Sequence, residues 1–313
     1  MLKGKLRRGF TFIELLFVIV ILGIVGGIAL EAIRLYYEGI YRTQTYAQRV
    51  NEADQILDKL TKYFENAIEY SIVNLDKDKV DTALDGGDCA EPGEEANEAT
   101  AHDYTVAFLG VDVDSLRTGN IPGWSEQPKI DFTALILTSN DANFTSADNV
   151  IKALYPASDL ANSAIYNHQG IVGSCSNLNW DKAGGLQGYY PITGVPSVHT
   201  LPLTNPGGGD DDTQKYLIRT GYAFRVLNTG DFMMYSNFRP WKMPAEPYSG
   251  GKKSILGQNV ASFYVDFNNT NSYADRGSIW RLKVCMRGVD SNLSTSDIAA
   301  SAICRERKVH VRY

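Results

Sequence analysis

The strongest constraint on this chain is an apolar run that begins ten residues from its N-terminus. Residues 10–30 hold one charged side chain, Glu14. As a helix they would reach about 30 Å, the thickness of a bilayer core. The preceding residues, 1–9, carry four basic side chains and no acidic one. Because basic flanks stay in the cytoplasm, the sequence predicts a transmembrane helix at residues 10–35 with the C-terminal body exported.

Two ordinary explanations of this run are incomplete. A secretory signal would have a shorter apolar core followed by a small-residue cleavage site, and residues 10–35 do not show that pattern cleanly. A plain membrane anchor leaves Glu14 unexplained, because a carboxylate that faces lipid is costly and usually marks a function.

A third interpretation accounts for both the run and the carboxylate. The sequence RRG-FTFIELLFVIVILGIVGGIAL resembles the N-terminus of type IV prepilins and type II secretion pseudopilins. In that family a basic leader ends in Gly, Phe follows, and Glu stands fifth after the cut; here these are Gly9, Phe10 and Glu14. The resemblance implies that a prepilin peptidase removes residues 1–9 and N-methylates Phe10. The formal net charge would then change from −6 to −10, since four basic residues leave.

The resemblance also implies a role for Glu14 in assembly. A carboxylate among apolar helices needs an opposite charge, and the N-terminal ammonium of Phe10 on a neighbouring subunit would supply it. Such a pair would set the axial register between subunits, as buried polar groups do in coiled coils. The implied partners are the prepilin peptidase, other minor and major pilins or pseudopilins, and the inner membrane before assembly.

Helical spacing continues beyond the apolar run. Residues 31–72 contain no proline, so we expect one helix without a proline kink from residue 10 to residue 72. Its second half, the amphipathic residues 36–72, should pack on the protein's own sheet. The apolar stripe that predicts this contact consists of Ile56, Leu57, Leu60, Phe64, Ala67, Ile68 and Ile72.

Residues 73–313 have the composition of a β-rich globular head. Most of residues 140–215 look irregular, and the other segments alternate apolar and polar residues, as half-buried antiparallel strands do. The fold class expected is therefore α+β and pilin-like, with a long N-terminal helix packed on an antiparallel sheet. The C-terminal fragments NVASFYVDF and SIWRLKVCMRG are similar to the last strands of larger minor pilins and of the J-type minor pseudopilin. The strands expected are Tyr104–Leu109, Ile130–Thr138, Tyr216–Leu227, Phe232–Phe238, Ala261–Phe267, Trp280–Met286 and an edge strand at Val309–Tyr313.

Four cysteines occur, and none forms a CxxC pair. An even set in an exported chain predicts two disulfides, for which the sequence allows three connectivities. The simplest scheme pairs Cys285 with Cys304 and Cys89 with Cys175.

Acidic clusters raise the question of calcium, which binds six to eight oxygen ligands. None of them forms a complete calcium loop, so we expect a solvated acidic surface and no cofactor, with calcium as the alternative. The candidates are Asp210, Asp211 and Asp212 after three glycines; Asn74, Asp76, Asp78 and Asp81; and the pair Asp112 and Asp114.

Composition and motifs narrow the function further. A net charge of −6 and a pI near 5.3 argue against nucleic acid as a partner, and a mean hydropathy of −0.21 excludes a polytopic membrane protein. No HExxH, GxSxG, GxGxxG or Walker sequence occurs, so an enzyme is not expected. We expect a minor pilin or pseudopilin near the filament tip of a type IV pilus or a type II secretion system. The alternative is a filament-tip or membrane-anchored adhesin or binding protein, and an anchored periplasmic enzyme is a third class.

Overall fold

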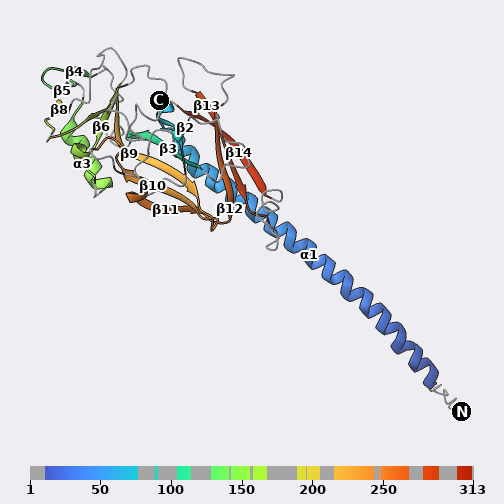
Figure 1. Ribbon diagram of the computed structural model, residues 1–313. Coiled ribbons are helices and arrows are strands. Elements are labelled where there is room, and N and C mark those ends of the chain that lie inside the picture. The colour runs from blue at the N-terminus through green and yellow to red at the C-terminus, as the bar shows by residue number, and fades with distance from the viewer. Residues whose placement is uncertain are drawn as a thin grey trace. The chain divides into compact units, whose positions relative to one another are not determined.

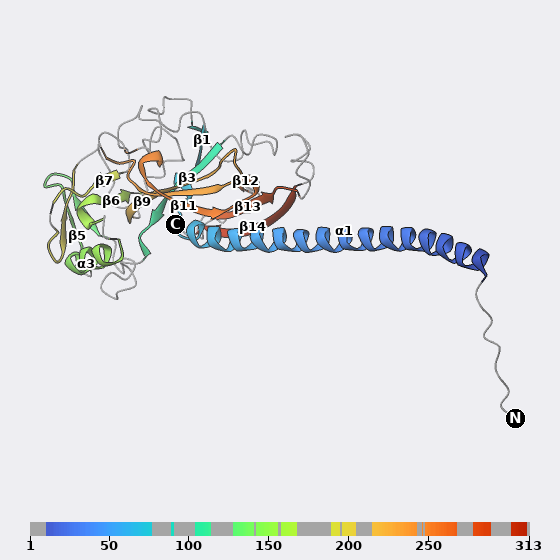
Figure 2. The same ribbon diagram turned by 90° about the horizontal axis from the view of Figure 1, so that it is seen from below.

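The structure is a computed structural model in which the chain forms two compact units, Met1–Arg49 and Val50–Tyr313 (Figures 1 and 2). The residues that it describes are 11–76, 89–90, 104–113, 128–140, 142–155, 158–167, 189–194, 196–204, 215–242, 246, 248–267, 278–288 and 302–311.

Helix α1, Phe12–Phe64, is the longest element and contributes to both units (Figure 1). The absence of proline lets it continue without interruption, as expected. Within the second unit its buried residues are Ala53, Ile56, Leu57, Leu60 and Phe64. They recur every three or four positions, which confirms the predicted stripe.

The helix ends at Phe64 and not at residue 72, where the apolar spacing placed its end. Beyond Phe64 the chain runs beside strand β3 (Tyr104–Val111). Ile68 N–H donates to the Leu109 carbonyl at 2.9 Å, and Val111 N–H donates to the Asn66 carbonyl at 2.8 Å. These backbone groups are satisfied by a strand and not by a helix turn. The side chains of Ala67, Ile68 and Ile72 are still buried, so the stripe is correct although the helix is shorter.

The large antiparallel sheet has eight strands in the order β11-β10-β9-β3-β1-β2, with β6 paired to β9 and β7 to β6. The predicted hairpin at 216–238 is confirmed as β9 and β10. Its turn needs Gly230, which has φ +90°, a conformation that glycine adopts without strain. The bounds are β1 Val73–Asp76, β2 Cys89–Ala90, β6 Ala164–Asn167, β7 Tyr189–Pro191, β9 Lys215–Val226, β10 Phe232–Phe238 and β11 Lys252–Gly257.

The three C-terminal strands form a separate antiparallel sheet, β12 (Val260–Phe267), β13 (Ser278–Met286) and β14 (Ile303–Val311), in that order. The last strand lies at the edge, as expected, but it begins at Ile303 and not at the predicted Val309. Cys285 and Cys304 face each other across β13 and β14 and form a disulfide with a Cα–Cα distance of 4.0 Å. The predicted pairing of these two cysteines is therefore present.

The strand expected at Ile130–Thr138 is wrong, because the chain folds back within it. It forms β4 (Lys129–Asp131) and β5 (Ile136–Thr138), which join β8 (Thr200–Pro202) in a third sheet. The Asp131 carboxylate accepts N–H groups of Thr133 at 2.8 Å and Ala134 at 2.9 Å, which stabilises the turn. The same bonds hold the pKa of Asp131 below its usual range.

The segment 140–215 is more regular than expected. Besides β6, β7 and β8 it holds helix α3 (Phe144–Leu154) and the short 3-10 helix η3 (Leu160–Asn162). The side chain of Asn143 caps α3 by accepting the Ser146 N–H at 2.9 Å. Two further 3-10 helices are η1 (Glu69–Ser71) and η4 (Tyr248–Gly250).

The core of the body has three clusters, and the large sheet is buried on both faces. Val106 and Phe108 of β3 belong to the cluster that contains the α1 stripe and strands β12–β14. The intervening Ala107 and Leu109 belong to a second cluster, which includes Tyr235 of β10. Because successive side chains of a strand point to opposite faces, the expectation of one buried face fails for β3. A third cluster joins α3 to the sheet β4-β5-β8.

Candidate functional site: the N-terminal segment of helix α1

The first described residues form a hydrogen-bonded cap on helix α1. The Thr11 N–H and the Thr11 hydroxyl each donate to Oε2 of Glu14 at 3.0 Å. A Glu at the third helical position that reaches back to the cap residue is one half of a capping box. Thr-x-x-Glu before an apolar run is a recognisable signal for this arrangement, and the sequence analysis did not use it. Gly9 and Phe10, the predicted cleavage and methylation positions, lie outside the described residues.

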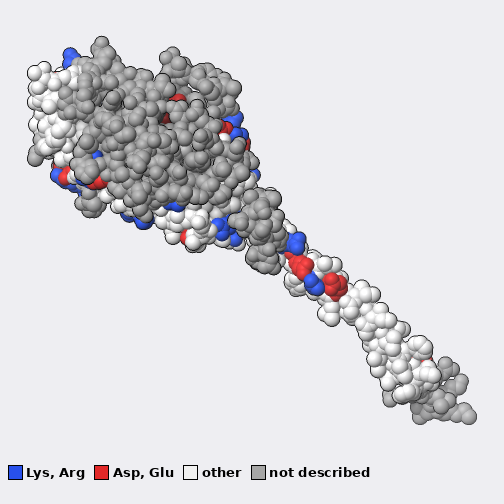
Figure 3. All heavy atoms as spheres, viewed as in Figure 1, with Lys and Arg blue, Asp and Glu red and all other residues white. Residues whose placement is uncertain are grey.

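Between Phe12 and Leu35 the large apolar side chains all face outward. Their exposed fractions run from 43% for Val18 to 79% for Phe12. Among the described residues, α1 is the single helix long and apolar enough to cross a membrane, with a mean hydropathy of 2.8 and none of that window buried. In Figure 3 this part of the helix surface is almost free of charged atoms. A helix that is apolar all round must be covered by lipid or by other helices.

The apolar surface ends at a group of charged and aromatic residues. Arg34 Nε lies 3.0 Å from Glu38 Oε1, and Arg34 Nη1 lies 4.0 Å from Glu31 Oε2. Tyr36 and Tyr37 follow directly and are 67% and 65% exposed. Tyrosines beside an apolar span are typical of a membrane–water interface. Their position just after the apolar run is a signal that the sequence itself carries.

Comparison with known proteins agrees with this geometry. Residues 4–30 match the family model for the prokaryotic N-terminal methylation motif. The N-terminus is that of a type IV prepilin or pseudopilin. Searches of curated proteins and of solved structures return no match for the chain. The motif implies processing by a prepilin peptidase, assembly with other pilins and anchoring in the membrane by the N-terminus.

The other predicted site residues divide into those that the structure describes and those that it does not. The backbone of Cys89 pairs with Leu75 in the large sheet, whereas Cys175 lies outside the described residues, so the second disulfide stays a prediction. Asp78, Asp81, Asp114 and Asp210–Asp212 also lie outside them. Asp112 is buried, and Asn74 and Asp76 lie in β1. In the described part of the chain, no three His, Cys, Asp or Glu residues converge as a metal site would require.

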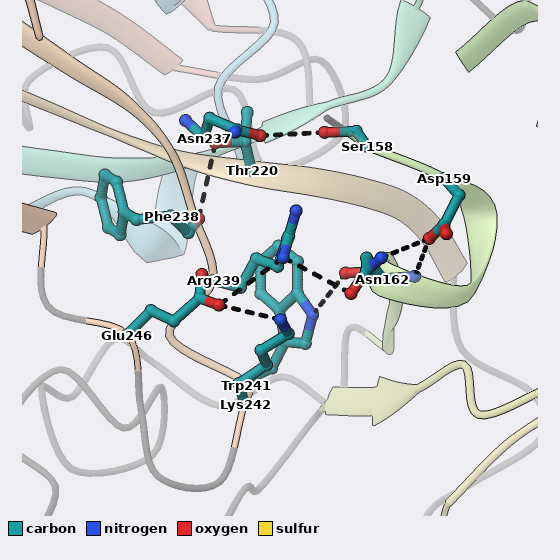
Figure 4. A network of polar contacts seen from close by, with 10 residues as sticks. All are labelled: Ser158, Asp159, Asn162, Thr220, Asn237, Phe238, Arg239, Trp241, Lys242 and Glu246. Carbon is teal, nitrogen blue, oxygen red and sulfur yellow. Dashed lines mark hydrogen bonds and ion pairs between the residues drawn. The ribbon is translucent and has the colours of Figure 1, made fainter. Parts of the chain in front are cut away.

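One polar network within the body lies at the end of β10, in the fragment YSNFRPW at residues 235–241 (Figure 4). Asn237 has a left-handed φ of 61°, and its N–H donates to Thr220 Oγ1 at 2.7 Å. Its Oδ1 accepts the Ser158 hydroxyl at 2.9 Å. The bulge at Asn237 thereby connects β9, β10 and the segment that follows α3.

The same network includes two buried side chains, the cationic Arg239 and the aromatic Trp241. Arg239 Nη1 lies 3.5 Å from Glu246 Oε1, which also accepts Lys242 Nζ at 2.8 Å. Trp241 Nε1 donates to the Asn162 carbonyl at 3.3 Å. These contacts anchor η3 to the end of β10, so the network positions a wall of the body.

Proposed function

We propose that the protein is a minor pilin or pseudopilin, a structural subunit of a type IV pilus or of a type II secretion pseudopilus, and not an enzyme. The observation that carries the proposal lies within helix α1. The methylation motif and an exposed apolar surface occupy its first half, and the stripe that builds the core of the body occupies its second half. One helix thus combines an assembly segment with the frame of a folded head.

In this proposal the subunit has four parts: a leader at 1–9, a membrane and filament-core helix at 10–35, an amphipathic helix from residue 36 to Phe64, and the β-rich head. It resides first in the bacterial inner membrane as a single-pass protein with its head in the periplasm. It then enters the filament or reaches the cell surface. Neighbouring genes for a secretin and an assembly ATPase would distinguish the two machines.

The size of the head supports a minor subunit near the tip. Three core clusters and three sheets follow helix α1, and a head of this bulk is hard to repeat along a densely packed shaft. Glu14 supports a place below the apex, because its pairing role requires a neighbour that offers an N-terminal ammonium. We therefore place the protein in the complex that starts assembly, beneath at least one other subunit.

The test of this function begins with processing. Protein isolated from a native, peptidase-positive membrane should begin with N-methyl-Phe10, as measured by intact mass and N-terminal peptide analysis. Replacing Gly9 by Leu should leave the full precursor in the inner membrane, since a bulky side chain fits the peptidase poorly. A Met1 terminus on the unaltered chain in such cells would contradict the proposal.

Position in the filament is tested separately. Single cysteines are introduced along residues 40–55, and the native cysteines are left in place. Partner subunits without an introduced cysteine are the controls. The introduced cysteines should crosslink to other minor subunits more than to the major one. Crosslinks that join mainly copies of this protein would identify it as a major subunit.

A further inference from the structure

The body carries a cleft that none of the proposed assembly contacts uses. Two adjoining hollows of about 300 and 380 Å3 share the walls Tyr63, Tyr155 and Tyr222, with Arg219 and Thr220 between them. The last turns of α1, the end of β3, the residue after α3 and strands β9–β11 all contribute. Hollows of this size fit a small ligand.

A buried arginine forms part of the cleft wall. Arg219 is 7% exposed, and its guanidinium carbon lies 3.4 Å from the centre of the Tyr155 ring. Among the residues that the structure describes, its Nε has no hydrogen-bond partner. A buried donor without a partner is costly. Because Arg219 lines both hollows, an anion in the cleft would meet its guanidinium charge.

Further cations surround this arginine. Lys62 lines one hollow and Lys252 the other, and neither has a polar partner within the described residues. Lys59 donates to the Leu256 carbonyl at 3.3 Å and also lines the cleft. The cleft therefore has four cationic side chains, and the buried Asp112 is the one carboxylate among the described residues that line it. The cleft is therefore basic in a protein whose net charge is −6, and it favours an anionic ligand.

The aromatic walls are built into the fold. A Cβ on Gly110 would lie 2.6 Å from the Tyr222 ring, so the glycine lets that ring lie across β3. Tyr63 and Tyr222 pack with ring centroids 5.3 Å apart. Each tyrosine presents an apolar ring face and a polar hydroxyl.

The second hollow adds small polar groups to these rings. Ser158 and Asn237 reach it from the network of Figure 4, and Ser236 and Ser254 reach it from β10 and β11. Hydroxyls, an amide and tyrosine faces together suit a ligand that has many hydroxyls and apolar C–H surfaces. Clusters of cationic side chains also bind acidic peptides, so the test below includes one.

We propose that this cleft binds an acidic saccharide, with sugar carboxylates at Arg219, at Lys62 in one hollow and at Lys252 in the other, and with the sugar rings against Tyr155 and Tyr222. The site belongs to the body alone, so it is independent of the machine in which the subunit assembles. A subunit with such a site would also serve as a binding protein on its filament.

The test is calorimetric titration of the full chain in lipid nanodiscs with trigalacturonate, with neutral maltotriose and with a tetra-aspartate peptide. Trigalacturonate should bind saturably and at least about tenfold more tightly than maltotriose, because its carboxylates add charge-assisted hydrogen bonds to the basic side chains. Lys252→Glu should weaken trigalacturonate binding by about tenfold or more for the same reason.

Lys253→Glu is the matched control, since Lys253 is the next residue of β11, points to the opposite face and does not line the cleft. It should change the affinity by less than about twofold, as an exposed charge does. Thermal unfolding of both variants verifies that each is folded.

Three results would overturn the proposal. They are no saturable binding of trigalacturonate, equal losses in Lys252→Glu and Lys253→Glu, or tighter binding of tetra-aspartate than of trigalacturonate. The last would assign the cleft to an acidic peptide.

Discussion

The two halves of helix α1 share a secondary structure and differ in how they are covered. From Phe12 to Leu35 the apolar side chains surround the helix and stay exposed within the chain. From Ala53 to Phe64 they form one stripe, and the body buries it completely. Both halves contain Ile, Leu and Phe. Residues 53–64 interleave them with the charged Asp54, Asp58, Lys59 and Lys62, whereas residues 12–30 hold only one charged side chain, Glu14.

The difference shows where each half finds its partner. A stripe can be satisfied by one sheet of the same chain, whereas an apolar surface all around the helix needs lipid or several neighbouring helices. The first half therefore supplies a surface that lipid or other helices must cover, and the second half supplies part of the core of the head. Each of the following predictions tests that division.

The largest effect is expected for Glu14→Val. Loss of one partner from a buried ion pair costs about 3–5 kcal/mol, so the amount of this subunit in sheared filaments should fall by more than about tenfold. Membrane insertion and the unfolding of the head should not change, because valine is favourable in lipid. Quantitative immunoblotting measures incorporation, and Glu31→Gln, on the same helix beyond the apolar run, is the control. Normal incorporation of Glu14→Val would refute the pairing role.

Phe64→Ala should give the next largest effect, in the opposite half. Phe64 is fully buried, with its ring centroid 4.6 Å from that of Phe108. Its truncation should lower the unfolding free energy of the head by about 3–5 kcal/mol in denaturant titrations of the full chain in detergent. Phe17→Ala, at a side chain that is 66% exposed, should leave that free energy unchanged. Equal destabilisation by both variants would remove the distinction between the halves.

The disulfide concerns the head alone. Replacing Cys285 and Cys304 together by alanine should cost the head about 2–4 kcal/mol, because the bond restricts the unfolded chain. The head should keep its fold, and the double variant should insert into the membrane normally. Non-reducing peptide mapping of the unaltered protein should recover the Cys285–Cys304 pair; free thiols at both positions in periplasmic material would contradict it.

The smallest effect is expected from the ion pairs that join the second half of α1 to β14. Asp54 pairs with Arg305 Nε at 3.2 Å, and Asp58 pairs with Arg307. Both pairs are partly exposed, so Asp58→Asn should lower stability by less than about 1 kcal/mol. Glu38→Gln removes the Arg34–Glu38 ion pair, which lies on α1 before the second unit begins at Val50, and should not affect the head. Unfolding of both variants at low and high salt measures the difference in the stability of the head. A larger loss of stability in Glu38→Gln than in Asp58→Asn would contradict the division between the halves.

Several features followed from the sequence alone because their causes are local. The N-terminal signal needs only the order of a basic leader, Gly9, Phe10, Glu14 and an apolar run. The buried stripe follows from helical spacing, and the β9–β10 hairpin follows from alternation around a turn with Gly230. The face-to-face position of Cys285 and Cys304 agreed with the simplest pairing, although spacing alone allowed others.

The tertiary structure decided what depends on distant partners. Helix α1 stops at Phe64 because the backbone of Asn66 and Ile68 bonds to β3, which is some forty residues away in the sequence and carries no local mark of that contact. The Asp131 turn and the Asn143 cap had local signals, but many Asp and Asn residues of loops look the same before their hydrogen bonds are formed. The basic cleft had no signal at all. Its walls come from α1, β3, β9, β10, β11 and the end of α3. Only packing brings Lys62 and Lys252 to the two adjoining hollows that Arg219 lines.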